Sequence, residues 1–105
     1  MQVAKYFKER GEEIDFDSFE VQELSKKHGL ELFMLYIFYD HDFFKELRIK
    51  PLVFRNFIEK IQSGYLNNPY HTSTHALDVT QVYIILLFQL IHFSRQLIFL
   101  FTSAR

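Results

Sequence analysis

Two histidines and an aspartate near the middle of the chain are the residues whose types and spacing best suit chemistry. His71 and His75 lie four positions apart, and Asp78 follows three positions after His75. On an α-helix, residues three or four positions apart project from one face, with Cβ atoms about 5–6 Å apart. Zinc binds imidazole nitrogen and carboxylate oxygen, and a catalytic zinc site keeps one position open. This helix face could therefore form half of a divalent-metal site.

The same spacing also has a purely structural interpretation. His-x-x-x-His pairs occur often by chance. The residues between the two histidines are hydroxyl side chains, namely Thr72, Ser73 and Thr74. Hydroxyl oxygens at a helix start accept hydrogen bonds from backbone N–H groups that have no partner within the helix. On spacing alone, a metal site and an ordinary polar helix start therefore both stay open.

Helices are the elements expected to position this segment, because apolar residues recur at steps of three and four. Pro51 is expected at the first turn of one helix, and Gly64 follows its end. The sequence shows no repeat and no alternating stretch long enough for a strand, so the predicted fold class is all-α. The expected helices run from about Ser18 to His28, from Leu30 to about Phe44, from Pro51 to about Ser63, and from Tyr70 onward.

Composition excludes several classes of protein. The chain has 105 residues, of which 49% are hydrophobic, so it can bury one modest core and has no room for a second domain. A net charge of −1 gives no basic surface for nucleic-acid phosphates. Without cysteine the chain has no disulfide, no thiolate nucleophile and no cysteine-bound zinc. The N-terminus becomes charged before any apolar run, so we expect a cytoplasmic protein without an export signal.

The stretch 82–101, VYIILLFQLIHFSRQLIFLF, differs from the rest because Arg95 is its only charged residue. Twenty residues are long enough to span a bilayer. An arginine well inside the bilayer costs about 2.5–3.5 kcal/mol on insertion scales, which disfavours a span. We expect instead a core helix that lacks its partners, whose exposed surface promotes self-association. Membrane contact, and with it a membrane-associated location, is the alternative.

Residues 70–81 closely resemble the signature of the class I cyclic nucleotide phosphodiesterases. The family motif is Tyr-His-Asn-x-x-His-Ala-x-Asp-Val-x-Gln, usually after Asn-Pro. This chain reads Tyr-His-Thr-Ser-Thr-His-Ala-Leu-Asp-Val-Thr-Gln after Asn68-Pro69. The preceding order of Phe16-Asp17-Ser18-Phe19, Phe54-x-x-Phe57-Ile58 and Gly64-Tyr65 is also similar. Thr72 departs from the motif, because the family has asparagine there.

The resemblance covers roughly residues 13–87 and implies a fold and a domain organisation. It identifies the chain as the N-terminal portion of a multi-helical, HD-type phosphodiesterase catalytic domain. Residues 1–12 would be an N-terminal extension, and residues 13–105 a partial catalytic domain with a divergent apolar tail from about residue 88. The implied activity is hydrolysis of cyclic AMP or cyclic GMP to the 5′-monophosphate in cyclic nucleotide signalling.

The resemblance also implies roles for three residues. His71 would be the general acid that protonates the departing ribose O3′, and His75 would be the first zinc ligand. Tyr70 would form a wall beside the cyclic nucleotide substrate. The implied cofactors are Zn²⁺ and a second divalent cation, for which Mg²⁺ is expected, with a metal-bridging hydroxide attacking the phosphorus.

The remaining family ligands follow this motif in the family, and the 105 residues do not contain them. We therefore expect little or no turnover by this chain alone, since one ligand cannot hold zinc in a fixed, open site. The Asp40-His41-Asp42 cluster precedes the motif and is interpreted as a solvated helix end. The competing hypothesis is a non-catalytic helical interaction or membrane-docking module that uses the apolar stretch 82–101.

Overall fold

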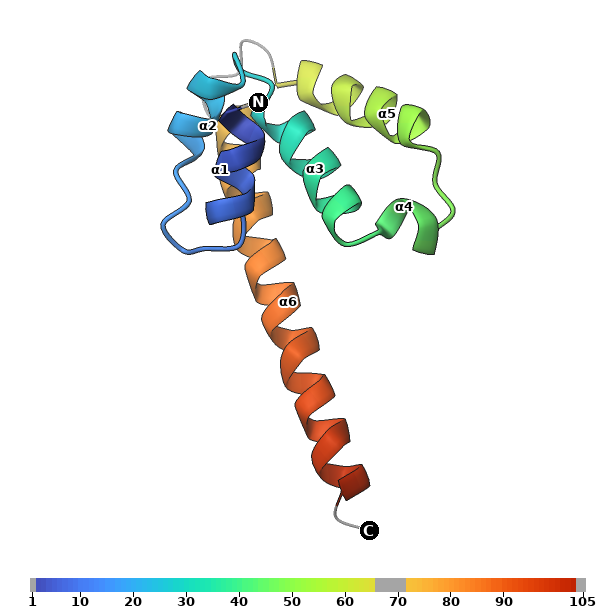
Figure 1. Ribbon diagram of the computed structural model, residues 1–105. Helices are drawn as coiled ribbons and strands as arrows, with labels where there is room; N and C mark the ends of the chain where they lie inside the picture. Colours follow the sequence, from blue (N-terminus) through green and yellow to red (C-terminus); the bar gives the residue numbers. More distant parts are fainter. Residues whose placement is uncertain (1, 66–71, 104–105) are drawn as a thin grey trace.

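The computed structural model describes residues 2–65 and 72–103, and every regular element within these ranges is a helix (Figure 1). This confirms the predicted all-α class. Five helices form a body from which the sixth projects, and the overall dimensions are 58 × 31 × 27 Å. The helices are α1 (Gln2–Arg10), α2 (Ser18–Leu24), α3 (Gly29–Asp40), α4 (Phe43–Glu46), α5 (Pro51–Ser63) and α6 (Ser73–Ser103).

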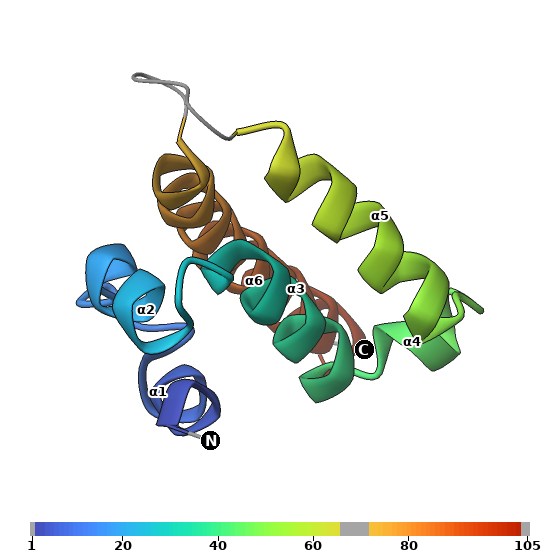
Figure 2. The same ribbon diagram turned by 90° about the horizontal axis from the view of Figure 1, so that it is seen from above.

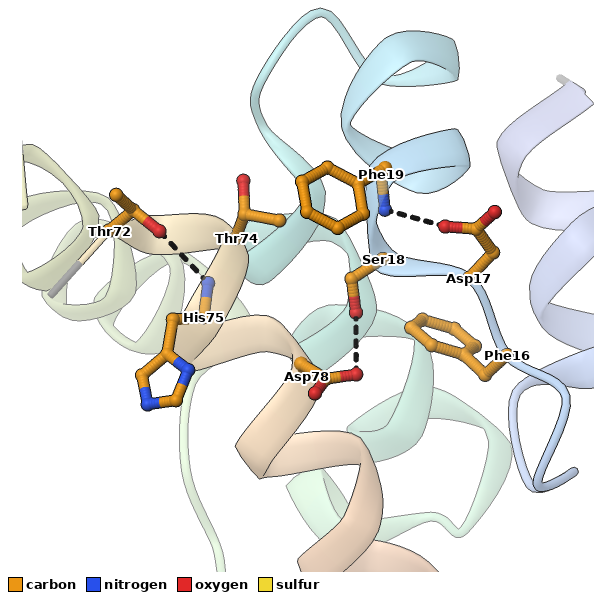
Figure 3. A pocket seen from close by; sticks show the side chains of 8 residues that line it. All are labelled: Phe16, Asp17, Ser18, Phe19, Thr72, Thr74, His75 and Asp78. Carbon is orange, nitrogen blue, oxygen red and sulfur yellow. Dashed lines mark hydrogen bonds between the residues drawn. The ribbon is translucent and has the colours of Figure 1, made fainter. Parts of the chain in front are cut away.

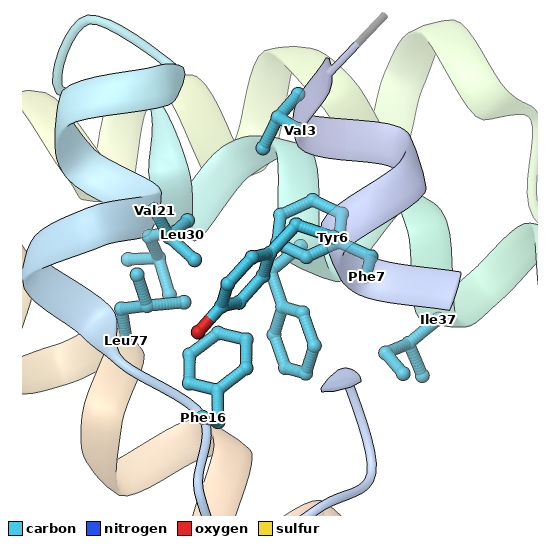
Figure 4. Packing of buried hydrophobic residues seen from close by; sticks show 9 residues of the cluster. Val3, Tyr6, Phe7, Phe16, Val21, Leu30, Ile37 and Leu77 are labelled. Atoms are coloured by element: carbon cyan, nitrogen blue, oxygen red, sulfur yellow. The ribbon is translucent and has the colours of Figure 1, made fainter. Parts of the chain in front are cut away.

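The core lies where α1, α2, α3 and the first turns of α6 meet (Figure 4). Phe33 and Ile37 of α3 and Leu77 of α6 have no exposed surface. Phe33 contacts the rings of Phe7 and Phe16, each at a centroid distance of 5.3 Å. The buried cluster consists of Val3, Tyr6, Phe7, Phe16, Val21, Leu30, Phe33, Ile37 and Leu77. Burial of this apolar surface is the main stabilising contribution to the body.

Helix α1 was not expected from the sequence, yet it forms part of this core. Val3, Tyr6 and Phe7 are spaced at three and four positions and are all buried. The Tyr6 hydroxyl accepts a hydrogen bond from the Asp17 N–H at 2.7 Å, which ties α1 to the start of α2. Residues 2–10 are therefore packed into the body. The family boundary near residue 13 stays a prediction.

Helix α2 begins as the sequence indicates but ends earlier. The Asp17 carboxylate caps it by accepting hydrogen bonds from the N–H groups of the next helical turn. The expected helix to His28 is wrong, because α2 ends at Leu24. Lys26 and Lys27 adopt positive φ angles of 54° and 68°, which no α-helix can accommodate. The tight turn that results aims the chain directly into α3.

The expected single helix from Leu30 to Phe44 is divided into α3 and α4. Asp42 has a φ of 58°, so the chain turns between the two helices. The turn allows Phe43 and Phe44 to contact Phe38, at centroid distances of 5.4 and 5.3 Å. Phe38 also stacks on Phe54 of α5 at 4.0 Å. Aromatic packing across the turn thus replaces continuation of the helix.

Helix α5 has the predicted boundaries, from Pro51 to Ser63 with Gly64 at its C-terminal cap. It lies beside α3, as the view from above shows (Figure 2). The contact includes a buried carboxylate, because Glu31 of α3 accepts a hydrogen bond from Arg55 Nε at 3.1 Å. The Glu31 N–H donates to Gln62 Oε1 at 3.1 Å. These bonds satisfy buried polar groups at the start of α3.

Helix α6 contacts the body over its first turns and then runs away from it (Figure 1). Its printed bounds begin at Ser73, after the non-helical Thr72, whereas Tyr70 and His71, where the sequence pattern places the helix start, lie outside the described residues. Leu77 and Gln81 are buried, while every residue from 89 to 103 is exposed. The helix is long and apolar enough to cross a membrane, with a mean hydropathy of 1.8 in its most apolar window. Length and composition alone do not distinguish a span from a core helix.

Candidate functional site

A pocket of about 510 Å³ opens between the start of α6 and the start of α2 (Figure 3). One wall comes from the signature segment and the other from the residues that lead into α2. The lining residues are Phe16, Asp17, Ser18, Phe19, Thr72, Thr74, His75 and Asp78. Of the site residues expected from the sequence, His75 therefore lies at this pocket. His71 and Tyr70 fall outside the described residues.

The signature segment divides between two faces of α6. His75 and Asp78 are exposed and line the pocket, whereas Leu77 and Gln81 are buried in the body. Gln81 Nε2 donates hydrogen bonds to the carbonyl oxygens of Gly11 at 3.3 Å and Glu13 at 2.7 Å. A period of 3.6 residues produces this division. The buried residues of the motif fix the rotation of the helix, and the polar residues face the pocket as a consequence.

Thr72 caps α6, at the position where the motif departs from the family. Its hydroxyl oxygen accepts a hydrogen bond from the His75 N–H at 3.1 Å. This is the pattern of a helix N-cap, in which the cap side chain binds the third residue of the helix. Asparagine is an equally good cap residue. The threonine therefore performs a capping role that the family's asparagine is also able to perform.

We expect Thr72→Ala to lower the free energy of unfolding by about 1 kcal/mol, because the His75 N–H loses its acceptor. Thr72→Asn is the matched variant and should retain wild-type stability within about 0.5 kcal/mol. Urea unfolding followed by circular dichroism measures both. Equal losses for the two variants would show that the hydroxyl does not cap this helix.

Gln22 of α2 joins three elements beneath the pocket. Its amide oxygen accepts a hydrogen bond from the Gly29 N–H at 3.0 Å, and its amide nitrogen donates to the hydroxyls of Ser73 and Thr74, both at 3.0 Å. Gly29 is the residue that permits this approach, since a Cβ there would lie 2.7 Å from Gln22 Oε1. Sequence reasoning missed this bridge. The only sequence signal for it was the amide side chain of Gln22 itself, beside the apolar Val21 on a short helix.

Asp78 is held by the start of α2. The Ser18 hydroxyl donates a hydrogen bond to Asp78 Oδ1 at 3.2 Å, as Figure 3 shows. This contact joins residues 60 positions apart in the chain. It orients a carboxylate at the pocket, three residues after the imidazole of His75. Imidazole nitrogen and carboxylate oxygen are both zinc ligand types, and the two side chains line the same pocket.

A second polar cluster forms around His41, at the other end of the body. His41 Nε2 lies 2.7 Å from Glu12 Oε1 and 3.6 Å from Asp40 Oδ2. Within the described ranges these three residues are the one set whose ligand atoms all lie within 4.8 Å of one another. Burial, Asp40 and Glu12 together raise the pKa of the nearby Tyr36 hydroxyl above its usual value.

The His41 cluster is separate from the pocket at His75. The His41 ring contacts Phe88 of α6 at a centroid distance of 4.1 Å. Phe88 follows His75 by 13 positions, which corresponds to about 20 Å along the helix. Asp40 and Asp42 are exposed, as expected for a helix end, but no sequence pattern indicated that Glu12 would lie beside Asp40 and His41. The cluster fastens the middle of α6 to α3.

Known proteins similar to this chain are cyclic nucleotide phosphodiesterases. The 3′,5′-cyclic-AMP phosphodiesterase 4 of Dictyostelium discoideum is 41% identical over 68 residues, which cover 64% of this chain and 6% of that protein. The probable 3′,5′-cyclic phosphodiesterase pde-1 of Caenorhabditis elegans is 32% identical over 68 residues, covering 63% of this chain and 10% of that protein. The mouse dual specificity calcium/calmodulin-dependent 3′,5′-cyclic nucleotide phosphodiesterase 1B is also 32% identical over 68 residues, covering 63% of this chain and 13% of that protein.

The chain thus corresponds to a small part of each of these relatives, between 6% and 13% of their length. No family model matches the chain, and no solved structure matches it. Two findings agree with the resemblance of residues 70–81. The described residues form the all-helical fold class that it implied, and the relatives are all named as 3′,5′-cyclic phosphodiesterases. Over about two thirds of its length the chain is therefore similar to cyclic nucleotide phosphodiesterases, in agreement with the resemblance of residues 70–81.

Proposed function

We propose that this chain supplies the general acid and the first metal ligand of a 3′,5′-cyclic nucleotide phosphodiesterase. The observation that carries the proposal is the arrangement of the signature on α6. Leu77 and Gln81 fix the helix in the body, so that His75 and Asp78 line the pocket. The names of the relatives support the reaction class. The cytoplasm is the proposed location.

The chemistry requires a proton donor and a means of activating water. Divalent metal ions, for which we propose zinc and magnesium, supply an activated hydroxide when bound and stabilise charge on phosphoryl oxygens. The His75 imidazole would hold the zinc. His71 would donate its proton to the ribose O3′, because an unprotonated alkoxide is a poor leaving group. A histidine suits this task, since its unperturbed pKa of about 6.5 allows it to hold and release a proton near neutrality.

The proposed substrate is a cyclic nucleotide, with Tyr70 forming one wall of its site. One relative is named for cyclic AMP and another for dual specificity, so the names do not favour one purine. By resemblance, His75 is the only zinc ligand in these 105 residues. We therefore propose that the isolated chain hydrolyses cyclic nucleotides little or not at all, and that activity requires the further ligands that follow this segment in the family.

A segment exchange tests the proposal. Residues 13–87 of this chain, the range of the resemblance, replace the corresponding segment of the Dictyostelium phosphodiesterase, and hydrolysis of cyclic AMP is measured. We expect the chimera to be active. His71→Ala in the chimera should lower kcat by about 10²–10⁴-fold, the usual contribution of a general acid.

His28→Ala is the matched control, because His28 is exposed and lies outside the pocket. It should leave kcat within about twofold of the chimera. A chimera that folds, as shown by circular dichroism and by its melting temperature, but hydrolyses nothing would contradict the proposal. So would a His71→Ala chimera with an unchanged kcat.

An interaction module remains the second candidate function, because one observation favours it. The outer half of α6 exposes large apolar side chains, and the described part of the chain does not cover them. This hypothesis does not require His71 or His75. The segment exchange therefore distinguishes the two functions, since only the phosphodiesterase proposal requires the histidines.

A further inference from the structure

Seven apolar side chains form a continuous stripe along α6, here called the α6 seam. They follow one another at alternating steps of four and three residues, the heptad spacing of a coiled coil. The pattern extends over 22 residues without interruption, and each member is apolar. The α6 seam consists of Val79, Tyr83, Leu86, Leu90, Phe93, Leu97 and Leu100.

The α6 seam is exposed along its whole length. Exposure of its seven members lies between 37% and 68%. The opposite side of the same helix contacts the body: Gln81 binds the carbonyl oxygens of Gly11 and Glu13, and Phe88 contacts the His41 ring. At 100° per residue, Gln81 and Phe88 lie about 160–180° from the seam. The contacts that dock α6 therefore direct the seam away from the body, where a partner can approach it.

We propose that the α6 seam pairs with the α6 seam of a second copy of this chain. The available area suffices for such a dimer. An aromatic side chain buries about 150–250 Å² when fully covered, so a large half-exposed side chain contributes about 100 Å². The seven seam residues and the flanking Val82, Leu87 and Phe101 then give about 800–1,000 Å² per copy. A stable interface needs about 800 Å² per partner.

Charge also permits this pairing. In a coiled coil the residues on either side of the seam face the partner helix, and like charges there oppose association. The flanking positions of α6 within 79–101 carry no charge: they are Thr80, Val82, Leu87, Gln89, Ser94, Gln96 and Phe101. Arg95, the one charged residue of the stretch, lies on the side opposite the seam. Two copies therefore meet without electrostatic repulsion.

A membrane suits the same helix less well. His92 lies at the middle of the stretch 82–101, and Arg95 lies about 5 Å further along the helix. Both lie on the side opposite the seam, where a single spanning helix would expose them to hydrocarbon. Polar side chains within spans usually face a protein interior. In a dimer the same two side chains face water.

The experiment compares two double variants of the 105-residue chain by analytical ultracentrifugation. Leu90→Glu with Leu97→Glu changes the seam, whereas Ile91→Glu with Ile98→Glu changes neighbouring positions about 80–100° away. The pairs are closely matched, because exposure is 64% and 39% in the first and 40% and 63% in the second. Leu90, Leu97 and Ile98 line no pocket with residues of the body, whereas Ile91 lines a pocket with His41 and Phe43. The melting temperature of each variant is therefore measured as well, so that a disturbed body is recognised.

We expect a wild-type dimer, a seam variant whose dimer dissociation constant is at least about 100-fold higher, and a control variant that remains dimeric. A monomeric wild-type chain would overturn the proposal. Equal weakening in both variants would also overturn it, because it would indicate unspecific apolar association. Flotation with phosphatidylcholine vesicles, with or without phosphatidylserine, tests whether the seam binds a membrane instead. If the wild-type chain floats and both variants lose this property, the occupant is a membrane and the proposal fails.

Discussion

Leu77→Ala is expected to lower the free energy of unfolding by about 3–4 kcal/mol. Leu77 has no exposed surface and joins α6 to the core formed by α1, α2 and α3. Its Cδ2 atom lies 2.9 Å from the position that a Cβ on Gly29 would occupy, which shows how closely α3 approaches it. Leucine-to-alanine changes in tight cores cost about 2.7–5 kcal/mol, because neighbouring atoms do not collapse into the cavity.

Such a loss is a large share of the total stability of a small domain, which is about 5–15 kcal/mol. The measurement is urea unfolding followed by circular dichroism, because the chain has no tryptophan to serve as a fluorescent probe. Ile98→Ala is the control, since Ile98 lies on the same helix, outside the α6 seam, and is 63% exposed. It should cost less than about 1 kcal/mol. If the two variants lose equal stability, α6 is not docked through Leu77, and the position of His75 is not determined by the core.

His75→Ala is expected to reduce kcat/KM of the segment-exchange chimera by at least about 10³-fold. The reason is that a metal ion at a phosphodiesterase site both generates the nucleophile and stabilises charge on the phosphoryl oxygens. Loss of one ligand weakens the ion's binding and its geometry together. The side chain itself is exposed at the pocket, so its removal should leave the melting temperature nearly unchanged.

Thr80→Ala is the control for this prediction. Thr80 lies on the next turn of α6 and does not line the pocket, so kcat/KM should stay within about twofold of the chimera. The comparison separates loss of a ligand from disturbance of the helix. If His75→Ala and Thr80→Ala have the same kinetic constants, His75 does not act on the metal or on the substrate.

Local backbone signals explain which parts of the fold could be predicted from the sequence. Pro51 fixes φ and lacks an N–H, and Gly64 ends the apolar pattern, so both ends of α5 were predicted correctly. The start of α2 near Ser18 was also predicted correctly, and there the short Asp17 carboxylate reaches the free N–H groups of the first turn. Each signal acts within four residues of the feature that it predicts.

The remaining features depend on contacts between distant residues. The end of α2 at Leu24 follows from positive φ angles at two lysines, a residue type with no preference for that conformation. The turn at Asp42 accompanies the packing of Phe43 on Phe38, a contact that no local pattern predicts. Helix α1 was missed because its sequence alone does not show that its three buried residues pack into the core.

The candidate site shows the same division. The motif around His75 is recognisable because its residue types are unusual together, and the structure places His75 and Asp78 of this motif at the pocket. Gln22 and Ser18, which position that segment, lie more than 50 residues before their partners on α6, and no local pattern indicates these contacts. The direction of the α6 seam was likewise inaccessible, because the helix is apolar on most of its circumference until Gln81 and Phe88 are seen to face the body.

The zinc content of the purified chimera, measured by inductively coupled plasma mass spectrometry, tests most directly whether this chain supplies a metal ligand. Samples of the chimera and of its His75→Ala and Thr80→Ala variants are compared after dialysis against the same buffer. We predict that the chimera and Thr80→Ala retain equal zinc and that His75→Ala loses it. Equal zinc in all three proteins would contradict the assignment of His75, and with it the function proposed for this segment.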